Sequence, residues 1–204
     1  MTGRYPGFDV LNQAPHWDQV TKDLIEARVR TSPPAVTFFS ATERGCAHAL
    51  LNDLTGQDRD DAPVPVTQLV EARLAAGETD GWRYADMPED GQAWRDTLGY
   101  LDADARARCG TAFAAAAEAD RHRLIQAVQD LSGEDWHGLP AKHVWSLWTR
   151  YACTALYAHP DVWAEMGFPG PAYPRGYKNI GVDKLEPYEV RDADPSIDPV
   201  RTGD

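Results

Sequence analysis

Residues 140–157 read Pro-Ala-Lys-His-Val-Trp-Ser-Leu-Trp-Thr-Arg-Tyr-Ala-Cys-Thr-Ala-Leu-Tyr, and this stretch decides the fold. Its large apolar side chains fall around nearly the whole circumference of a helix. A helix that is apolar on nearly every side belongs in the middle of a bundle, where other helices cover it. The stretch therefore predicts a central helix with further helices around it.

The rest of the chain supplies those further helices. Trp17, Val20 and Leu24 form one apolar stripe, and Ser40 with Glu43 has the form of a capping box that opens a helix closed by Gly56. The helices predicted by apolar period and end signals are 15–29, 40–56, 66–77, a helix opened by Pro88 that runs past residue 101, 114–131, and a short turn at 161–166. Sustained alternation of period two is absent from the sequence, so the predicted fold class is all-α.

The composition changes after His159, because seven of the 15 prolines fall in the last 45 residues. The Gly/Pro-rich stretch at 167–186 can be neither helix nor central strand, and we expect an extended arm there. We predict a single-domain bundle of about six helices over residues 1–186, including this arm, and a disordered acidic tail at 187–204.

Composition and charge exclude several classes of function. The chain has 204 residues and a net charge of −12, which disfavours nucleic acid and anionic membrane surfaces as partners. It has no apolar run of the roughly 20 residues that span a bilayer, so we expect no membrane insertion. Three widely spaced cysteines and the lack of a signal peptide predict reduced thiols and a cytoplasmic location.

The sequence motifs predict no catalytic, cofactor-binding or metal-binding residues in this chain. Glycine-rich phosphate loops, the dinucleotide fingerprint and the haem attachment motif are all absent from the sequence. Glu134 and His137 have the i, i+3 spacing of a di-iron carboxylate site, but the second copy that such a site needs is missing. The run Arg121-His122-Arg123 is better explained as a solvated helix face than as a metal site.

Aromatic residues leave two interpretations open. A pocket near Trp136, His137, His143 and Tyr151 would make the chain a stand-alone enzyme or a small-molecule-binding protein. The rings of the arm, by contrast, need another surface to lie on, which is either this protein's own bundle or a partner. His159 precedes a proline, so we expect it to end the central helix with its side chain at that helix's C-terminus.

The stretch from His159-Pro160-Asp161 through Gly167-Phe168-Pro169-Gly170-Pro171 to Gly176-Tyr177 resembles the C-terminal signature of the gluconate 2-dehydrogenase subunit 3 family. The upstream Phe38-Phe39-Ser40-x-x-Glu43 is similar to that family's N-terminal motif. The resemblance implies a cofactor-free helical accessory subunit that is not catalytic alone. Its implied partner-binding residues are His159, Trp163, Phe168, Pro169, Pro171, Tyr173, Pro174 and Tyr177.

The resemblance also implies the partner. In this family the large subunit is a flavin-containing oxidoreductase of the glucose-methanol-choline class, which oxidises a sugar, sugar acid or other alcohol by hydride transfer to FAD. A cytochrome c subunit can take the electrons onward. Many members begin with a twin-arginine export signal that this sequence lacks, so the resemblance implies a periplasmic location only if the chain is exported together with its partner.

Overall fold

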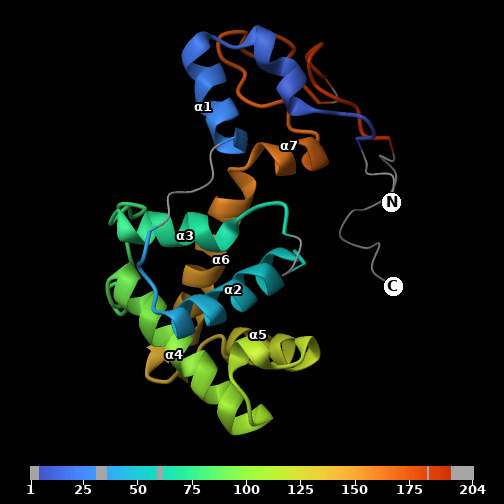
Figure 1. The fold of residues 1–204 in the computed structure, drawn as a ribbon. Coiled ribbons are helices and arrows are strands. Elements are labelled where there is room, and N and C mark those ends of the chain that lie inside the picture. Colours follow the sequence, from blue (N-terminus) through green and yellow to red (C-terminus); the bar gives the residue numbers. More distant parts are fainter. Residues whose placement is uncertain (1–4, 31–35, 59–61, 183, 194–204) are drawn as a thin grey trace. The chain divides into compact units, whose positions relative to one another are not determined.

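The computed structural model describes residues 5–30, 36–58, 62–182 and 184–193, and these are mostly helical, which confirms the predicted all-α class (Figure 1). Contacts divide the chain into two compact units, one of residues 33–156 and one that joins residues 1–32 to residues 157–204. The single domain predicted over residues 1–186 stays a prediction, and the unit that the two ends of the chain form is a feature that the sequence did not indicate.

Most of the helices belong to the 33–156 unit. Its elements are α2 (Ala41–Thr55), α3 (Val66–Ala75), α4 (Asp90–Cys109), the 3-10 turn η2 (Phe113–Ala115), α5 (Glu118–Leu131), β1 (Asp135–Trp136), β2 (Leu139–Pro140) and α6 (Ala141–Tyr157). The predicted capping box is confirmed, because Ser40 and Glu43 each accept a backbone N–H from the other. Gly56 ends α2 in the left-handed conformation, as predicted.

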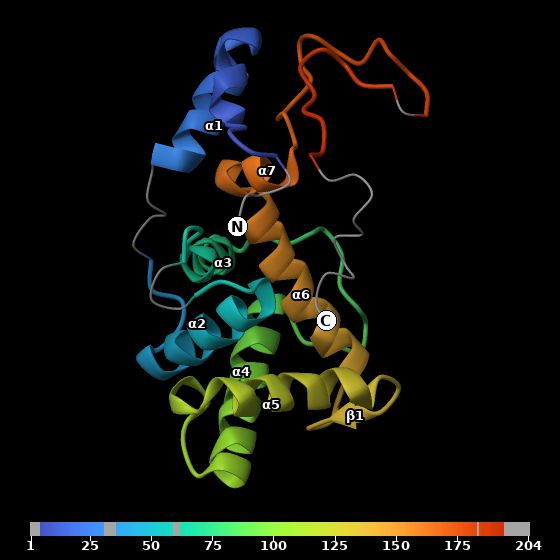
Figure 2. The ribbon, with the colours of Figure 1, turned by 90° about the vertical axis from the view of Figure 1, so that its right-hand side faces the viewer.

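The core of this unit lies where buried aromatic side chains of α4 and α6 pack between the two helices. Trp94, Leu98 and Leu101 form the buried face of α4, as their spacing predicted. Trp148 on α6 donates its indole N–H to Oγ1 of Thr97 at 3.0 Å, and its ring meets Trp136 edge-on at 5.5 Å. Figure 2 shows α6 running past α2, α3 and α4.

The prediction that α6 is covered on nearly every side is wrong. Val144, Leu147, Trp148, Tyr151 and Ala152 are buried, which makes one wide face. Cys153 and Tyr157 are exposed, and Trp145 is only half-buried. The apolar side chains do spread around α6, but only one wide face of the helix is buried, while Cys153 and Tyr157 lie at the surface.

Two local features differ from the predicted boundaries. The helix expected at 114–131 begins at Glu118, because the chain is extended at Ala116 and Ala117 after η2 buries Phe113. Asp102 holds this break by accepting the backbone N–H of Phe113 at 2.9 Å. The short hairpin β1–β2 was missed; its turn, His137-Gly138, has positive φ at both residues, which is the geometry that two-residue hairpin loops prefer.

The second unit contains η1 (Val10–His16), α1 (Gln19–Arg30) and α7 (Pro160–Met166). In Figure 1, α1 (blue) and α7 (orange) come from opposite ends of the sequence and lie side by side. Their shared core is made of apolar residues from all three elements, namely Val10, Ala14, Trp17, Ile25 and Trp163. The ends of the chain are thus joined by a small core of their own.

The predicted buried stripe on the first helix is wrong. Trp17 caps the end of η1 and lies before α1, so it does not share a helical face with Val20 and Leu24. Ile25 is the buried residue of α1, while Val20 is 77% exposed and Leu24 is 57% exposed. Of the predicted stripe, only Val20 and Leu24 lie on α1, and both are exposed.

None of the helices in the described parts of the chain is long and apolar enough to cross a membrane.

Candidate functional site

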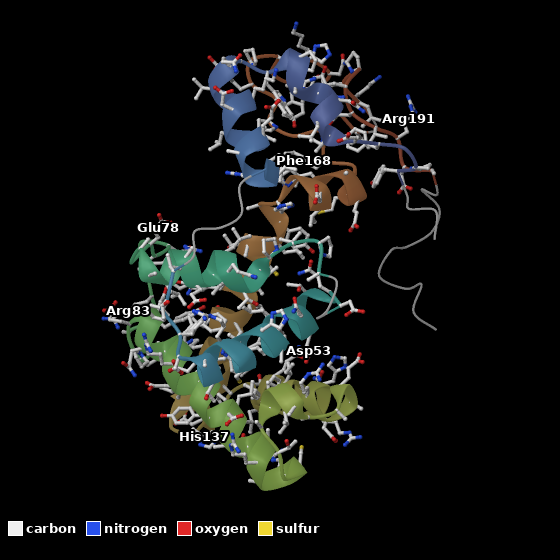
Figure 3. The ribbon with its side chains drawn as sticks, in the orientation of Figure 1. Asp53, Glu78, Arg83, His137, Phe168 and Arg191 are labelled. Atoms are coloured by element: carbon white, nitrogen blue, oxygen red, sulfur yellow. The ribbon has the colours of Figure 1, made fainter. Side chains whose placement is uncertain are left out.

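The first half of the arm packs on its own unit. Phe168, labelled in Figure 3, meets the ring of Trp163 edge-on at 5.3 Å, and Pro169 and Gly170 are buried. Gly170 has φ of +76°, and a Cβ at this position would lie 2.6 Å from Cζ2 of Trp17. Only glycine allows the backbone to approach the indole this closely. Of the two surfaces that the sequence left open for the arm, its own unit is therefore the one that receives residues 168–170.

The second half of the arm presents its rings outward. Tyr173 is 64% exposed and Tyr177 is 53% exposed. Between them, Nη1 of Arg175 donates to Oε1 of Gln13 at 2.9 Å, and the Arg175 guanidinium lies 3.8 Å from the ring centre of Tyr188. The arm is thus held by Arg175 while its two tyrosine rings remain available to another surface.

Part of the predicted disordered tail contacts the arm. The Tyr188 hydroxyl donates to the backbone oxygen of Gly176 at 2.8 Å, and its ring centre lies 6.2 Å from that of Tyr177. Residues 187–193 are described, and these contacts of Tyr188 were not indicated by the sequence. The rest of the predicted tail, residues 194–204, lies outside the described residues.

His159 and Trp163 are buried structural residues of the free chain. The expectation that His159 lies at the C-terminus of the central helix is wrong, because α6 ends at Tyr157 and His159 caps the N-terminus of α7. Its Nδ1 accepts the backbone N–H of Asp161 at 3.4 Å. Trp163 donates its indole N–H to the backbone oxygen of Tyr157 at 2.6 Å.

Exposure sorts the eight residues that the resemblance implied for partner binding. The buried ones are His159, Trp163 and Pro169, and Pro171 is half-buried. The exposed ones are Phe168, Tyr173, Pro174 and Tyr177. A partner could touch the second group directly, whereas the first group would act by holding the arm in place. Partner binding by the whole set stays a prediction.

The alternative pocket does not assemble from its four residues. The indole N–H of Trp136 and Nε2 of His137 lie 3.0 Å and 2.9 Å from the two carboxylate oxygens of Asp104. His137 is labelled in Figure 3. His143 instead lies 2.8 Å from Oδ1 of Asp86 and stacks on Tyr84. The cavity that His143 lines has a volume of about 10 Å³, which is room for about one water.

Tyr151 is committed to yet another carboxylate. Its hydroxyl donates to Oδ2 of Asp90 at 2.7 Å. Burial and this hydrogen bond raise the pKa of Tyr151 well above its ordinary value, so the phenol stays protonated at physiological pH. The four residues Trp136, His137, His143 and Tyr151 therefore bond to three different aspartates, and none of these contacts brings the four side chains together around one pocket.

Potential metal ligands are likewise dispersed. Within the described residues, no group of three or more His, Cys, Asp and Glu side chains lies close enough to hold a metal ion. His137 bonds to Asp104 and forms no metal site with Glu134, although the spacing of the two residues resembles that of a di-iron site. Burial and the charge of Asp102 raise the pKa of the Cys46 thiol, so that thiol is not available as a thiolate.

The motif at 38–43 forms a clasp, defined here as Phe38, Phe39, Arg44 and Glu71. Glu71 of α3 is buried and accepts the backbone N–H groups of Phe38 at 2.9 Å and Phe39 at 3.0 Å. Nε and Nη2 of Arg44 donate to the same carboxylate at 2.9 Å and 2.6 Å. The clasp fixes the segment that leads into α2, so the motif at 38–43 has a structural role in this chain.

Comparison with protein families identifies the chain. The sequence model of gluconate 2-dehydrogenase subunit 3 matches residues 30–170, which is well over half of the chain. The chain belongs to the gluconate 2-dehydrogenase subunit 3 family. Comparison with the curated proteins finds no match, and comparison with solved structures finds none either.

Membership of this family makes the chain one subunit of a multi-subunit dehydrogenase, and a partner subunit follows from that. The match includes the clasp, the whole 33–156 unit, α7 and the buried start of the arm. It stops at Gly170, so Tyr173 and Tyr177 lie beyond it although the quoted resemblance extended to them. The start of the arm that packs on its own unit, residues 168–170, therefore lies within the matched part of the chain. The exposed rings of Tyr173 and Tyr177 lie outside it.

Glu71→Gln is expected to lower the free energy of unfolding by about 2 kcal/mol at pH 7, because Arg44 and two N–H groups lose a charged acceptor. Burial acts to raise the pKa of Glu71. The hydrogen bonds from Arg44, Phe38 and Phe39 and the charge of Arg44 together outweigh this effect, so the pKa of Glu71 lies below its ordinary value. A lowered carboxylate pKa stabilises the fold above the unfolded value of about 4.3 and loses this contribution as pH falls through the folded value.

The difference between wild type and Glu71→Gln should therefore shrink in acid. Urea unfolding followed by circular dichroism at pH 7 and at pH 3 measures it. Glu78→Gln, at an exposed residue just after α3, is the matched control and is expected to change stability little. A wild-type advantage that grows toward pH 3 would contradict the proposed role of the carboxylate.

One charged pair was missed by sequence reasoning. The prediction of a solvated face at Arg121-His122-Arg123 is wrong for Arg121, which is buried. Its Nε and Nη2 donate to the two carboxylate oxygens of Asp53 at 2.6 Å and 2.8 Å, and Nη1 donates to the backbone oxygen of Ala116. Asp53 is labelled in Figure 3. The pair ties α5 to α2.

Proposed function

We propose that this chain is a cofactor-free accessory subunit that binds and stabilises a FAD-dependent oxidoreductase of the glucose-methanol-choline class. The observation that carries the proposal is the arm, whose start is buried on its own unit while Tyr173 and Tyr177 face outward. Exposed aromatic rings on a well-held segment are typical anchors of a protein interface. In a member of a dehydrogenase subunit family, the partner subunit is the natural receiver of such anchors.

The distribution of polar side chains supports an accessory role. His137, His143 and Tyr151 are each bonded to a different aspartate, so none of them is placed to act with another on one substrate. Redox chemistry would then belong to the partner, which would hold FAD and oxidise a sugar, sugar acid or related alcohol. A cytochrome c subunit is the electron acceptor that the family resemblance suggests, and we place the complex in the cytoplasm unless it is exported as a unit.

The direct test is co-expression with a candidate flavoprotein subunit of the glucose-methanol-choline class from the same organism, followed by size-exclusion chromatography. We expect the two chains to co-elute with flavin absorbance, and the chain purified alone to show no visible chromophore. A lone peak at 22.6 kDa in the presence of the flavoprotein would contradict the proposal and would favour a stand-alone role.

Tyr173→Ala combined with Tyr177→Ala is expected to weaken assembly with the flavoprotein at least tenfold. Large rings with few rotatable bonds lose little entropy on docking. A few such rings can therefore contribute most of the binding free energy, and their removal weakens binding strongly. The helical circular dichroism of the free chain should not change, because both rings are exposed. Titration calorimetry or biolayer interferometry measures the dissociation constant.

Tyr157→Ala is the matched control, since Tyr157 is exposed in the same unit but lies outside the arm. It should leave the dissociation constant within about threefold of wild type. If the double variant instead unfolds the free chain and binds the flavoprotein normally once folded, the whole arm is an internal strap.

A further inference from the structure

A small cavity lies beside the loop that joins α3 to α4 in the 33–156 unit. It is lined by loop residues and by the first residue of α4, namely Thr79, Gly81, Trp82, Arg83, Glu89 and Asp90. Its volume is about 240 Å³, below the roughly 300 to 1,000 Å³ of sites for drug-sized ligands. Arg83 is labelled in Figure 3. The proposed function makes no use of this cavity, whose size suits a ligand with a single ring.

Trp82 forms an aromatic wall of this cavity and is held from behind. The guanidinium of Arg150 lies 4.7 Å from the centre of its ring, and the ring of Tyr84 meets it edge-on at 5.2 Å. Asp80 forms ion pairs with Arg150 on α6 and with Arg73 on α3, so the guanidinium is itself fixed. The side chain of Trp82 is nevertheless 50% exposed. An aromatic surface that is held before binding loses little conformational freedom when a ligand packs on it.

Asp90 supplies a buried hydrogen-bond acceptor to the same cavity. Its side chain is only 7% exposed, and its Oδ2 accepts the hydroxyl of Tyr151 at 2.7 Å. Among the residues that the structure describes, none donates a hydrogen bond to Oδ1 of Asp90. A nearly buried carboxylate oxygen without a donor is unfavourable, so this position favours a ligand that brings a hydroxyl group to it.

The rim of the cavity carries both donors and acceptors. Nη2 of Arg83 lies 3.0 Å from Oε1 of Glu89, and Nη1 of Arg83 donates to the backbone oxygen of Met87 at 2.8 Å. The hydroxyl oxygen of Thr79 accepts the backbone N–H of Gly81 at 3.2 Å, so its O–H can donate to a ligand. A sugar matches this arrangement, because its hydroxyl groups donate and accept while the C–H face of its ring packs on an aromatic side chain.

The charges around the cavity favour a neutral ligand. Glu89 and Asp90 place two carboxylates in the lining against the single guanidinium of Arg83, so an anionic ligand would be repelled. A cationic ligand is attracted to an aromatic ring. Here, however, Arg150 already lies over the ring of Trp82, and Arg83 adds a second positive charge nearby. A neutral ligand with several hydroxyl groups avoids both kinds of repulsion.

We infer that this cavity binds a neutral sugar through a single ring. The C–H face of the sugar packs on the indole of Trp82, and its hydroxyl groups donate to the carboxylates of Asp90 and Glu89. Arg83 donates to the oxygens of the sugar. The inference goes beyond the proposed function and does not depend on it, because the site is formed by this chain alone. It assigns binding to the cavity and no chemical step.

The test is an NMR titration of the isotope-labelled full chain with D-glucose. The chain has seven tryptophans, and the indole N–H signal that Trp82→Phe removes identifies Trp82 among them. Glucose should shift this signal more than the other indole signals, with a dissociation constant on the order of 1 mM, as expected for a small ligand in an open site. A shift confined to another indole signal, or no shift at all, would overturn the inference.

Variants test the two groups that carry the inference. Trp82→Ala should weaken glucose binding at least tenfold, and Trp82→Phe should stay within about threefold of wild type because an aromatic face remains. Asp90→Asn keeps an acceptor for Tyr151 but removes the charged acceptor for the sugar, so it should also weaken binding at least fivefold. Trp145→Ala is the matched control, since Trp145 is a half-buried tryptophan on α6 outside the lining of the cavity. Circular dichroism checks that each variant is folded.

Two further ligands test the class of molecule. Sodium gluconate has the size of glucose but a negative charge, and choline is a small cation. Both should bind at least tenfold more weakly than glucose, because the lining disfavours either charge. Tighter binding of gluconate or of choline would overturn the assignment to a neutral sugar, and so would equal glucose binding by wild type and Trp82→Ala. None of these outcomes bears on whether the chain binds a flavoprotein.

Discussion

Arg121→Met is expected to lower the free energy of unfolding of the 33–156 unit by about 3 to 5 kcal/mol. The side chains of Arg121 and Asp53 are each only 6% exposed, so removal of the guanidinium leaves a buried carboxylate without the two N–H donors of Arg121 and with only Nε2 of His122 at 3.9 Å. The two bonds between them and the bond to Ala116 account for three of the donor positions of Arg121. Urea unfolding followed by tryptophan fluorescence measures the change, since Trp94 and Trp148 lie in the core of this unit.

Arg123→Met is the matched control for this prediction. Arg123 lies two residues along the same helix and its Nη1 bonds to Oδ1 of Asp120 at 2.6 Å, but this pair is on the surface. Exposed pairs contribute little because water solvates both charges, so we expect almost no change in stability. Equal losses from the two variants would show that the burial of the Asp53–Arg121 pair has no energetic effect.

A double variant tests the mechanism of the loss. Arg121→Met combined with Asp53→Leu removes both charges and replaces them with apolar groups of similar size. It should be more stable than Arg121→Met alone, because the penalty comes mainly from the orphaned carboxylate. A double variant less stable than the single one would assign the loss to packing of the Arg121 side chain.

Elements with local signals were predictable from the sequence. The α2 helix begins and ends where Ser40, Glu43 and Gly56 indicated, because a capping box and a C-terminal glycine act over only a few residues. The buried face of α4 followed from the spacing of Trp94, Leu98 and Leu101. Each of these features is decided within one or two helical turns.

Features that depend on distant residues were not predictable. Asp53 and Arg121 are 68 residues apart, and Glu71 and Arg44 are 27 apart, so nothing local pairs them. The stripe on α1 was found by its period, but whether a stripe is buried depends on what the rest of the chain brings to it. The same limit applies to the aromatic pocket, whose members are separated by the aspartates that they bind.

The arm shows both situations within a few residues. Its proline and glycine content predicted an extended segment, and the family resemblance suggested a partner surface. The exposed residues could not be separated from the buried ones, because that depends on where Trp17, from the other end of the chain, receives the backbone at Gly170. The contact joins residues that are far apart in sequence, and it decides which rings remain outside.

Gly170→Ala is expected to destabilise the unit formed by the two ends of the chain by about 2 to 3 kcal/mol. A left-handed backbone at φ of +76° is unfavourable for alanine, and its Cβ would lie 2.6 Å from Cζ2 of Trp17. Because this contact is too short, either the arm or the indole must move, and the core around Val10 and Trp163 would open with it. Hydrogen exchange measured by mass spectrometry should show faster exchange in residues 10–17 and at α7.

Gly176→Ala separates the two causes. Gly176 also has a left-handed backbone, at φ of +69°, but a Cβ there would meet nothing within 4 Å. Its expected cost is about 1 kcal/mol, from backbone strain alone, with exchange in residues 10–17 unchanged. If the two variants behave alike, backbone strain explains the whole effect and the close approach to Trp17 does not hold the arm. If only Gly170→Ala opens the core and also weakens binding to the flavoprotein, the packing of residues 168–170 positions Tyr173 and Tyr177 for contact with the partner.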